Sequence, residues 1–182
     1  MPFSIASNYI ATSAQLGFGV AEKLAETVVS GAAVDYVEFT GLLGNTDRVY
    51  WLHLQIINNY AGACSYNITY NAESTITNYY EQQITATSTT VSGARVNAPQ
   101  VLAVSAQNDC GYAEFVIVRD GGGYFRAQQS GQYGSAAGVV ALFRTIAGVN
   151  TTAEIIKLRI DATQAGGIGI GSVITLLRGR SK

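Results

Sequence analysis

The 182-residue sequence predicts an all-β protein, folded as an antiparallel sandwich of two β-sheets. Three features favour this fold class. Apolar and polar side chains alternate along most segments after residue 25, as in strands that bury one face. Clusters of Gly, Asn, Asp and Ser separate these segments at roughly the 8 to 12 residue spacing typical of sandwiches. No long segment has a helical period, and a sheet with one apolar face must bury it against a second layer.

A chain of this length suits one domain with a sizeable core. We expect residues 1–25 to form an N-terminal arm and residues 26–182 to form the β-sandwich domain. The arm has no strand alternation and ends in a short helical pattern. Two interpretations stay open: an extended segment that docks on a neighbouring subunit, and a leading strand or frayed tail. The candidate contact residues of the arm are Phe3, Ile5, Tyr9, Ile10, Leu16 and Phe18.

The first strands of the domain are predicted from side-chain alternation. In residues 26–42, Val37 and Phe39 face one way, and Tyr36 and Glu38 face the other. Residues 49–58 also alternate strictly. Their apolar face consists of Tyr50, Leu52, Leu54 and Ile56, and their opposite face of Val49, Trp51, His53 and Gln55.

The rest of the chain continues strand after strand. Residues 65–71 and 78–91 are rich in Thr and Tyr, which are favoured on a pleated surface. Further strands are predicted at residues 101–107, 112–120, 123–131, 139–148, 154–162 and 172–179. The total is about ten strands, joined by short turns.

Two glycine-rich segments invite comparison with phosphate-binding loops. Residues 166–172 read Gly-Gly-Ile-Gly-Ile-Gly-Ser, which matches no phosphate-loop spacing, contains no Lys and leads into a strand instead of a helix. We therefore expect a corner in which glycine lets the backbone turn or cross closely over another strand. Residues 120–125 are expected to form a hairpin turn.

The chain carries few charges, and we expect neither nucleic acid nor membrane as a partner. Charged residues make up 13% of the sequence, and Tyr, Thr, Ser, Asn and Gln are abundant. Such a surface suits a subunit that is packed against others. Residues 1–91 hold two bases and seven acids, whereas residues 92–182 hold nine bases and five acids. We interpret these charges as meeting within one domain, with a head-to-tail contact between molecules as the alternative. No dense basic run, secretion signal or long apolar span is present.

The sequence predicts a non-enzymatic protein with no cofactor and no metal. His53 is the sole histidine, so a catalytic triad or a His-rich metal site would have to be built around it. The acids that could be catalytic are Asp35, Asp47, Asp109 and Asp120. Most of them are expected at turns, where an Asp side chain forms a hydrogen bond with its own backbone. A glycosidase-like site, built from two acids that are distant in the chain, stays open as an alternative. Cys64 and Cys110 are expected to be small, buried or half-buried residues, with a bridge between them as the alternative.

Aromatic residues offer one candidate binding surface. We expect aromatic residues such as Trp51, Tyr79 and Tyr80 to lie in the core or at a subunit interface, where large rings with a polar tip are common. The alternative is that Trp51, Tyr79 and Tyr80 form a platform that stacks on sugar rings.

Several segments together resemble a jelly-roll-like module that recurs in virion proteins of tailed bacteriophages. The resemblance lies in residues 36–42, 52–60, 66–84 and 154–179. The last segment is similar to the usual end of such modules, in which a small-residue corner precedes a final strand. Leu176-Leu177-Arg178-Gly179 stands where Leu-Tyr-Gly is common, and Trp51-Leu52 stands where Tyr-Asp is usual. The resemblance implies a jelly-roll-like fold and a non-enzymatic virion component.

From this resemblance and the low charge we expect a capsid decoration or cement subunit. It would act as a homo-oligomer, with a trimer as one candidate, and bind the major capsid protein or other virion proteins. Its location would be the virion, assembled in the host cytoplasm. The alternatives are a tail or baseplate adhesin that binds a receptor, and a carbohydrate-binding or hydrolytic β-sandwich with acids in its concave face.

Overall fold

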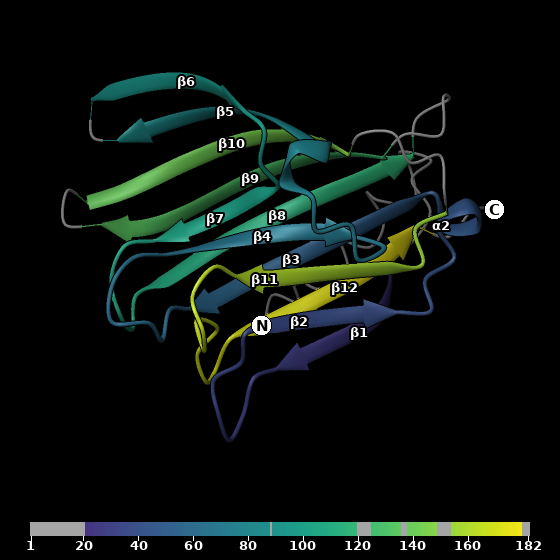
Figure 1. Cartoon of the computed structure of the whole chain (residues 1–182), viewed down its shortest axis with the longest axis horizontal. Coiled ribbons are helices and arrows are strands. Elements are labelled where there is room, and N and C mark those ends of the chain that lie inside the picture. The colour runs from purple at the N-terminus through teal and green to yellow at the C-terminus, as the bar shows by residue number, and fades with distance from the viewer. Residues whose placement is uncertain (1–20, 88, 120–124, 136–137, 149–153, 180–182) are drawn as a thin grey trace, which may run out of the picture.

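The structure is a computed structural model that describes residues 21–87, 89–119, 125–135, 138–148 and 154–179. Two antiparallel sheets make up this part of the chain (Figure 1). The larger sheet has eight strands in the order β1-β12-β3-β8-β9-β10-β5-β6, and the smaller has four in the order β2-β11-β4-β7. The strands are β1 (Ala21–Val28), β2 (Tyr36–Thr40), β3 (Val49–Ile57), β4 (Cys64–Tyr70), β5 (Tyr79–Thr87), β6 (Thr90–Val96), β7 (Gln100–Val104), β8 (Cys110–Arg119), β9 (Phe125–Ser135), β10 (Gly138–Gly148), β11 (Lys157–Ala162) and β12 (Val173–Gly179). The helical elements are short: α2 (Gly44–Asp47) and the 3-10 turn η1 (Ile76–Asn78).

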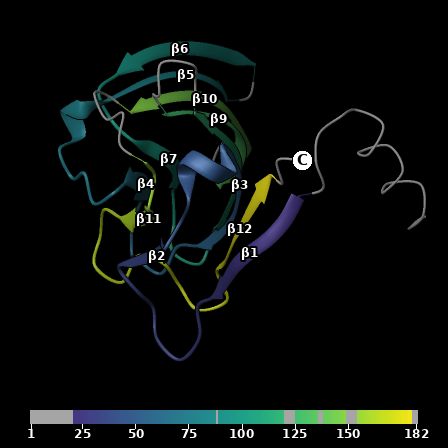
Figure 2. The same ribbon diagram turned by 90° about the vertical axis from the view of Figure 1, so that its right-hand side faces the viewer.

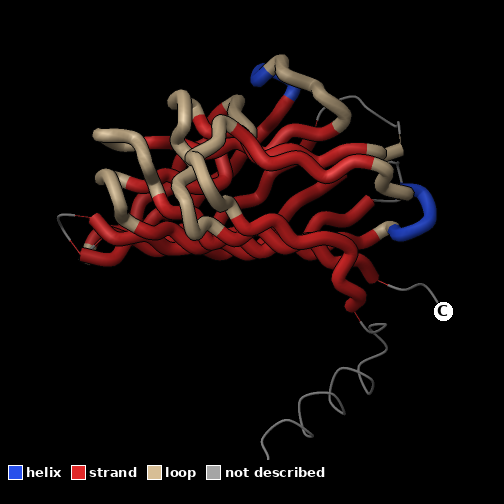
Figure 3. Tube along the Cα trace, turned by 90° about the horizontal axis from the view of Figure 1, so that it is seen from below, coloured by secondary structure: helices blue, strands red, loops and turns tan. Residues whose placement is uncertain are grey.

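The topology is jelly-roll-like with two inserted hairpins. Successive strands cross between the sheets, so that β1-β12-β3-β8 faces β2-β11-β4-β7. The β5–β6 hairpin is inserted between β4 and β7, and the β9–β10 hairpin between β8 and β11. Together the two hairpins extend the larger sheet beyond β8. Figure 2 shows this extension curving over the sandwich, and Figure 3 shows the two layers of strands edge-on. The predicted all-β, two-sheet sandwich is confirmed.

The first strand begins inside the predicted arm. β1 starts at Ala21 and pairs with β12 from Ala21 opposite Gly179 to Val28 opposite Val173. The helical pattern expected at the end of the arm is therefore wrong, because pairing with β12 overrides the helix propensity of the Ala, Glu, Lys and Leu residues there. The predicted contact residues Phe3, Ile5, Tyr9, Ile10, Leu16 and Phe18 lie outside the described residues.

The core lies between β3 of the larger sheet and β4 and β11 of the smaller one. The inner face of β3 has the predicted composition, and its four side chains, Tyr50, Leu52, Leu54 and Ile56, are fully buried. Ile68 on β4 and Leu158 and Ile160 on β11 are equally buried. On β2, Val37 and Phe39 point into the core, as predicted.

The glycine corner between β11 and β12 behaves as the sequence predicts. Gly166 and Gly171 adopt positive φ angles of 61° and 89°, which glycine accepts without steric cost. Between them, the buried Ile168 exchanges backbone hydrogen bonds with Val34 at 2.9 and 3.0 Å. Gly167 crosses so closely over the chain that a Cβ atom would lie 2.7 Å from Ala162 Cβ and 2.8 Å from Cys64 Sγ.

We expect Gly167→Ala to lower the free energy of unfolding by about 1–3 kcal/mol, because the added methyl group overpacks a site that backbone contacts hold in place. Chemical denaturation measures this change. Gly93→Ala is the matched control, since the nearest atom to its new Cβ would lie at an ordinary 3.8 Å. Equal effects of the two substitutions would contradict close packing at Gly167.

Candidate functional site

Side chains of the eight-stranded sheet point alternately into the core and out to solvent, and we call the solvent side the outer face. Trp51, His53 and Gln55 of β3 lie on this face, as predicted. Because neighbouring strands are paired in register, side chains of the outer face form rows that cross the sheet. Three rows run from β1 to β6.

One row carries no charged residue from one edge of the sheet to the other. Its members, in strand order, are Val28, Val173, Gln55, Tyr112, Gln132, Ala141, Ala86 and Val91. At about 4.8 Å between strands, the row is roughly 34 Å long along the sheet. Val28, Tyr112 and Val91 are exposed. The row is therefore a long apolar and hydrogen-bonding strip.

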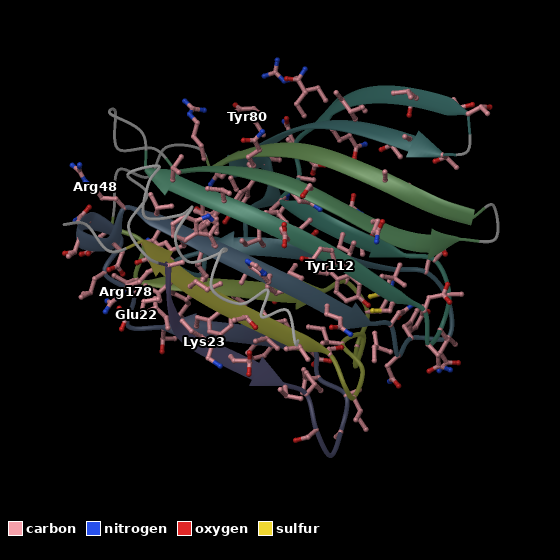
Figure 4. All side chains as sticks on the ribbon, turned by 180° about the vertical axis from the view of Figure 1, so that it is seen from behind. Glu22, Lys23, Arg48, Tyr80, Tyr112 and Arg178 are labelled. Carbon is pink, nitrogen blue, oxygen red and sulfur yellow. The ribbon has the colours of Figure 1, made fainter. Side chains whose placement is uncertain are left out.

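A second row is charged only at its ends. Lys23 on β1 and Arg95 on β6 occupy the ends, and the uncharged members between them include Leu177, Trp51, Val116, Gln128 and Gln82. Arg95 also lies over the ring of Tyr80, 5.6 Å from its centroid. Figure 4 views this face and labels Lys23, Tyr80 and Tyr112. The outer face thus keeps these two charges at its margins.

The third row holds the sole histidine. His53 Nδ1 lies 3.7 Å from Glu114 Oε1, and the two side chains are 44% and 47% exposed. The Tyr112 hydroxyl donates a short hydrogen bond to the same carboxylate oxygen. This bond, together with burial and the charge of Glu114, raises the pKa of Tyr112 to about 12. The three groups form a polar cluster on an open strand face, which suits hydrogen bonding to another molecule.

The aromatic platform, which was the alternative to a place in the core or at an interface, does not assemble. Tyr79 and Tyr80 are adjacent on β5 and therefore point to opposite faces; Tyr79 is only 1% exposed. Tyr80 lies on the outer face, but β8, β9 and β10 separate its strand from that of Trp51. The Trp51 ring is half-buried and lies against Gly179, where a Cβ atom would come within 3.3 Å of it. Alternation along β5 could have excluded Tyr79 from the sequence alone.

Tyr79 belongs to the core. Its ring stacks on that of Tyr70, with centroids 6.1 Å apart. Its hydroxyl accepts from the Tyr70 backbone N–H at 3.1 Å and donates to the Glu73 carbonyl at 2.9 Å. Burial is the main cause that raises the pKa of Tyr79 to about 12.

The inner face of the extension also carries polar residues that the sequence analysis missed. Glu81, two residues after Tyr79 on β5, is fully buried. Gln129 on β9 is buried as well, and its Nε2 donates to the Val101 carbonyl of β7 at 2.5 Å. Period-two counting from Tyr79 would have placed Glu81 inside.

Charges from the acidic and basic halves of the chain meet within the sandwich, as predicted. Arg178 lies 3.1 Å from Glu22 and 3.3 Å from Asp47. Lys157 lies 3.1 Å from Glu38 on the outside of the smaller sheet. These pairs join residues more than one hundred positions apart, and Figure 4 shows Arg178 beside Glu22.

Asp35 and Asp47, two of the acids considered for catalysis, form hydrogen bonds within the fold. Asp35 accepts from the Gly166 N–H at 2.6 Å, and Asp47 accepts from the Tyr50 hydroxyl at 2.9 Å. Asp120 lies outside the described residues. Cys64 is buried, as expected, whereas the expected burial of Cys110 is wrong, because Cys110 lies exposed at the start of β8; both are free thiols. Within the described ranges, no three His, Cys, Asp or Glu side chains gather as metal ligands.

Comparisons of the chain with family models, curated proteins and solved structures give no match. In the part of the chain that the structure describes, no helix has the length and apolar character needed to cross a membrane.

Glu114→Gln should lower the pKa of Tyr112 toward its ordinary value of about 10, because the neutral amide no longer favours the protonated phenol by charge. Titration of ¹³C-labelled tyrosine by NMR measures it, with Tyr112→Phe assigning the resonance. An unchanged pKa would show that Glu114 is not the acceptor.

Stability should fall as pH rises from about 10 to 12, because tyrosines of the unfolded chain lose their protons near pH 10 while Tyr79 keeps its proton in the folded state. Tyr79→Phe should make this decline shallower. At pH 8 the same substitution should cost about 1–2 kcal/mol, since the buried Tyr70 N–H loses its acceptor. Urea denaturation at each pH tests both effects, with the exposed Tyr60→Phe as control.

Proposed function

We propose that this chain is a non-enzymatic structural subunit of a tailed-phage virion, a capsid decoration or cement protein that acts as a homo-oligomer and binds the major capsid lattice. The observation that carries the proposal is the outer face of the eight-stranded sheet. Its uncharged row crosses all eight strands, and the charges of the second row lie at the margins.

Such a face fits a permanent contact with a repeated protein surface. Val28, Val116 and Val91 supply apolar area that gains free energy when water is removed. Gln55, Gln128 and Gln132 donate and accept hydrogen bonds without the cost of removing a charge from water. A small gain at each contact becomes large when many linked copies bind one lattice. The resemblance to phage virion modules suggests that this lattice is a phage capsid.

A tail or baseplate component that binds a host receptor is the second candidate. Half-exposed rings favour it: Trp51 and Tyr112 both lie on the outer face, on the neighbouring strands β3 and β8. Rings in this setting stack on sugars as well as on protein. The two candidates differ in copy number, because a decoration subunit accompanies the many capsid subunits and a tail component does not.

Quantitative mass spectrometry of purified phage particles from the source tests the proposal. We expect the chain in numbers comparable to those of the major capsid protein. A few copies per particle would favour the tail candidate, and absence from the particles would overturn the virion assignment.

We expect Val116→Asp to reduce incorporation at least tenfold, because it replaces an exposed apolar side chain of the outer face with a second carboxylate, two residues from Glu114, at a position where the fold tolerates a polar group. Ile156→Asp is the control: Ile156 is exposed but directly precedes β11, a strand of the smaller sheet. Circular dichroism checks folding of both variants. Equal incorporation of the two would exclude the outer face as the contact.

A further inference from the structure

A groove runs along the open side of the sandwich, between the edge strands β1 and β2. Two adjoining cavities of about 420 and 330 Å³ form it, and both are lined by Thr27 of β1 and Glu38 of β2. We call this the edge groove. Its remaining wall includes Leu24, Phe39, Leu42 and Leu43. Figure 2 shows β1 and β2 on this side of the molecule.

Both walls of the edge groove present strand edges. β1 is the first strand of the larger sheet and pairs with β12; β2 is the first strand of the smaller sheet and pairs with β11. Within the described residues, no further strand pairs with either one. An edge strand offers N–H and C=O groups to an additional strand. The groove therefore has the geometry for strand addition.

The chemistry of the edge groove favours an uncharged occupant. Its charged groups already have partners inside the molecule: Arg178 with Glu22 and Asp47, and Glu38 with Lys157. A charged occupant would have to compete with these pairs. Leu43, by contrast, is 52% exposed and would gain free energy on being covered.

We propose that the edge groove binds residues 1–20 of a second copy of this chain as an added β-strand. This inference rests on the self-association in the proposed function and names the segment that provides it. Residues 1–20 contain no Asp, Glu, Lys, Arg or His. The segment as a whole has no sustained alternation, but Phe3 and Ile5, and again Leu16 and Phe18, are spaced by two, so each pair can face one side of a short strand.

A second copy fits the groove better than the same chain does. The segment joins β1 at Ala21, so it would have to reverse direction beside Ala21 to lie along its own β1. The reversal would place Leu16 and Phe18 in the turn instead of the groove. A segment from a neighbour needs no reversal, and twenty extended residues reach up to about 66 Å.

Photo-crosslinking of the full-length chain tests the proposal. Phe18 is replaced by p-benzoylphenylalanine, the purified protein is irradiated, and the products are separated by denaturing electrophoresis. We expect a covalent dimer of twice the chain mass, with mass spectrometry placing the linked residue between residues 24 and 43. Linkage within one chain, or in a dimer at another part of the fold, would overturn the proposal, as would the absence of any link.

Leu43→Asp in the crosslinking chain should lower the dimer yield at least fivefold, because it adds charge to the groove. Ile84→Asp is the matched control: Ile84 is also 52% exposed but lies on β5. Equal loss in both variants would also overturn the proposal. No capsid is present in this assay, so the two proposals can fail separately. Loss of the crosslink would overturn the strand exchange without affecting incorporation into particles. Loss of incorporation would overturn the proposed function without affecting the crosslink.

Discussion

The central constraint on this molecule is the two-residue alternation of β3, held in register between β12 and β8. Its inner side chains, from Tyr50 to Ile56, have no solvent exposure and contact the smaller sheet. A slip of one residue would expose all of them and bury Trp51, His53 and Gln55 in their place. The register is therefore fixed by hydrophobic burial. The same register determines which side chains lie together on the outer face, because each row contains a β3 residue and its partners on β12 and β8.

The two sheets differ in size, and this difference shapes the molecule. Four strands of the larger sheet face the smaller sheet, and the inserted hairpins add β9, β10, β5 and β6 beyond it. The added strands have a more polar inner face, as the buried Glu81 and Gln129 show. Gln129 bonds the backbone of β7 and so joins the extension to the smaller sheet. The sandwich is thus bridged on the β7 side and open on the β1–β2 side.

Local patterns in the sequence predict much of this fold. Alternation identifies β2 and β3 and the faces of both, and the glycine spacing identifies the corner before β12 as a turn. The beginning of β1 stays open between a docking arm and a leading strand, because its composition favours a helix and only pairing with β12, about 150 residues away, makes it a strand. The rows of the outer face are also invisible locally, since each depends on pairing between distant strands. Tyr79 is a different case: its burial agrees with the core interpretation and follows from alternation with Tyr80, which the platform alternative neglected.

In the proposed exchange, the edge groove of each molecule is the acceptor and residues 1–20 are the donor. Contacts of this kind are either reciprocal, which ends at two molecules, or head-to-tail, which continues until the rotation closes a ring. Cyclic symmetry would then come from the angle at which the donor leaves Ala21, not from complementarity between broad surfaces. A change of a few residues before β1 would alter stoichiometry without altering the sandwich.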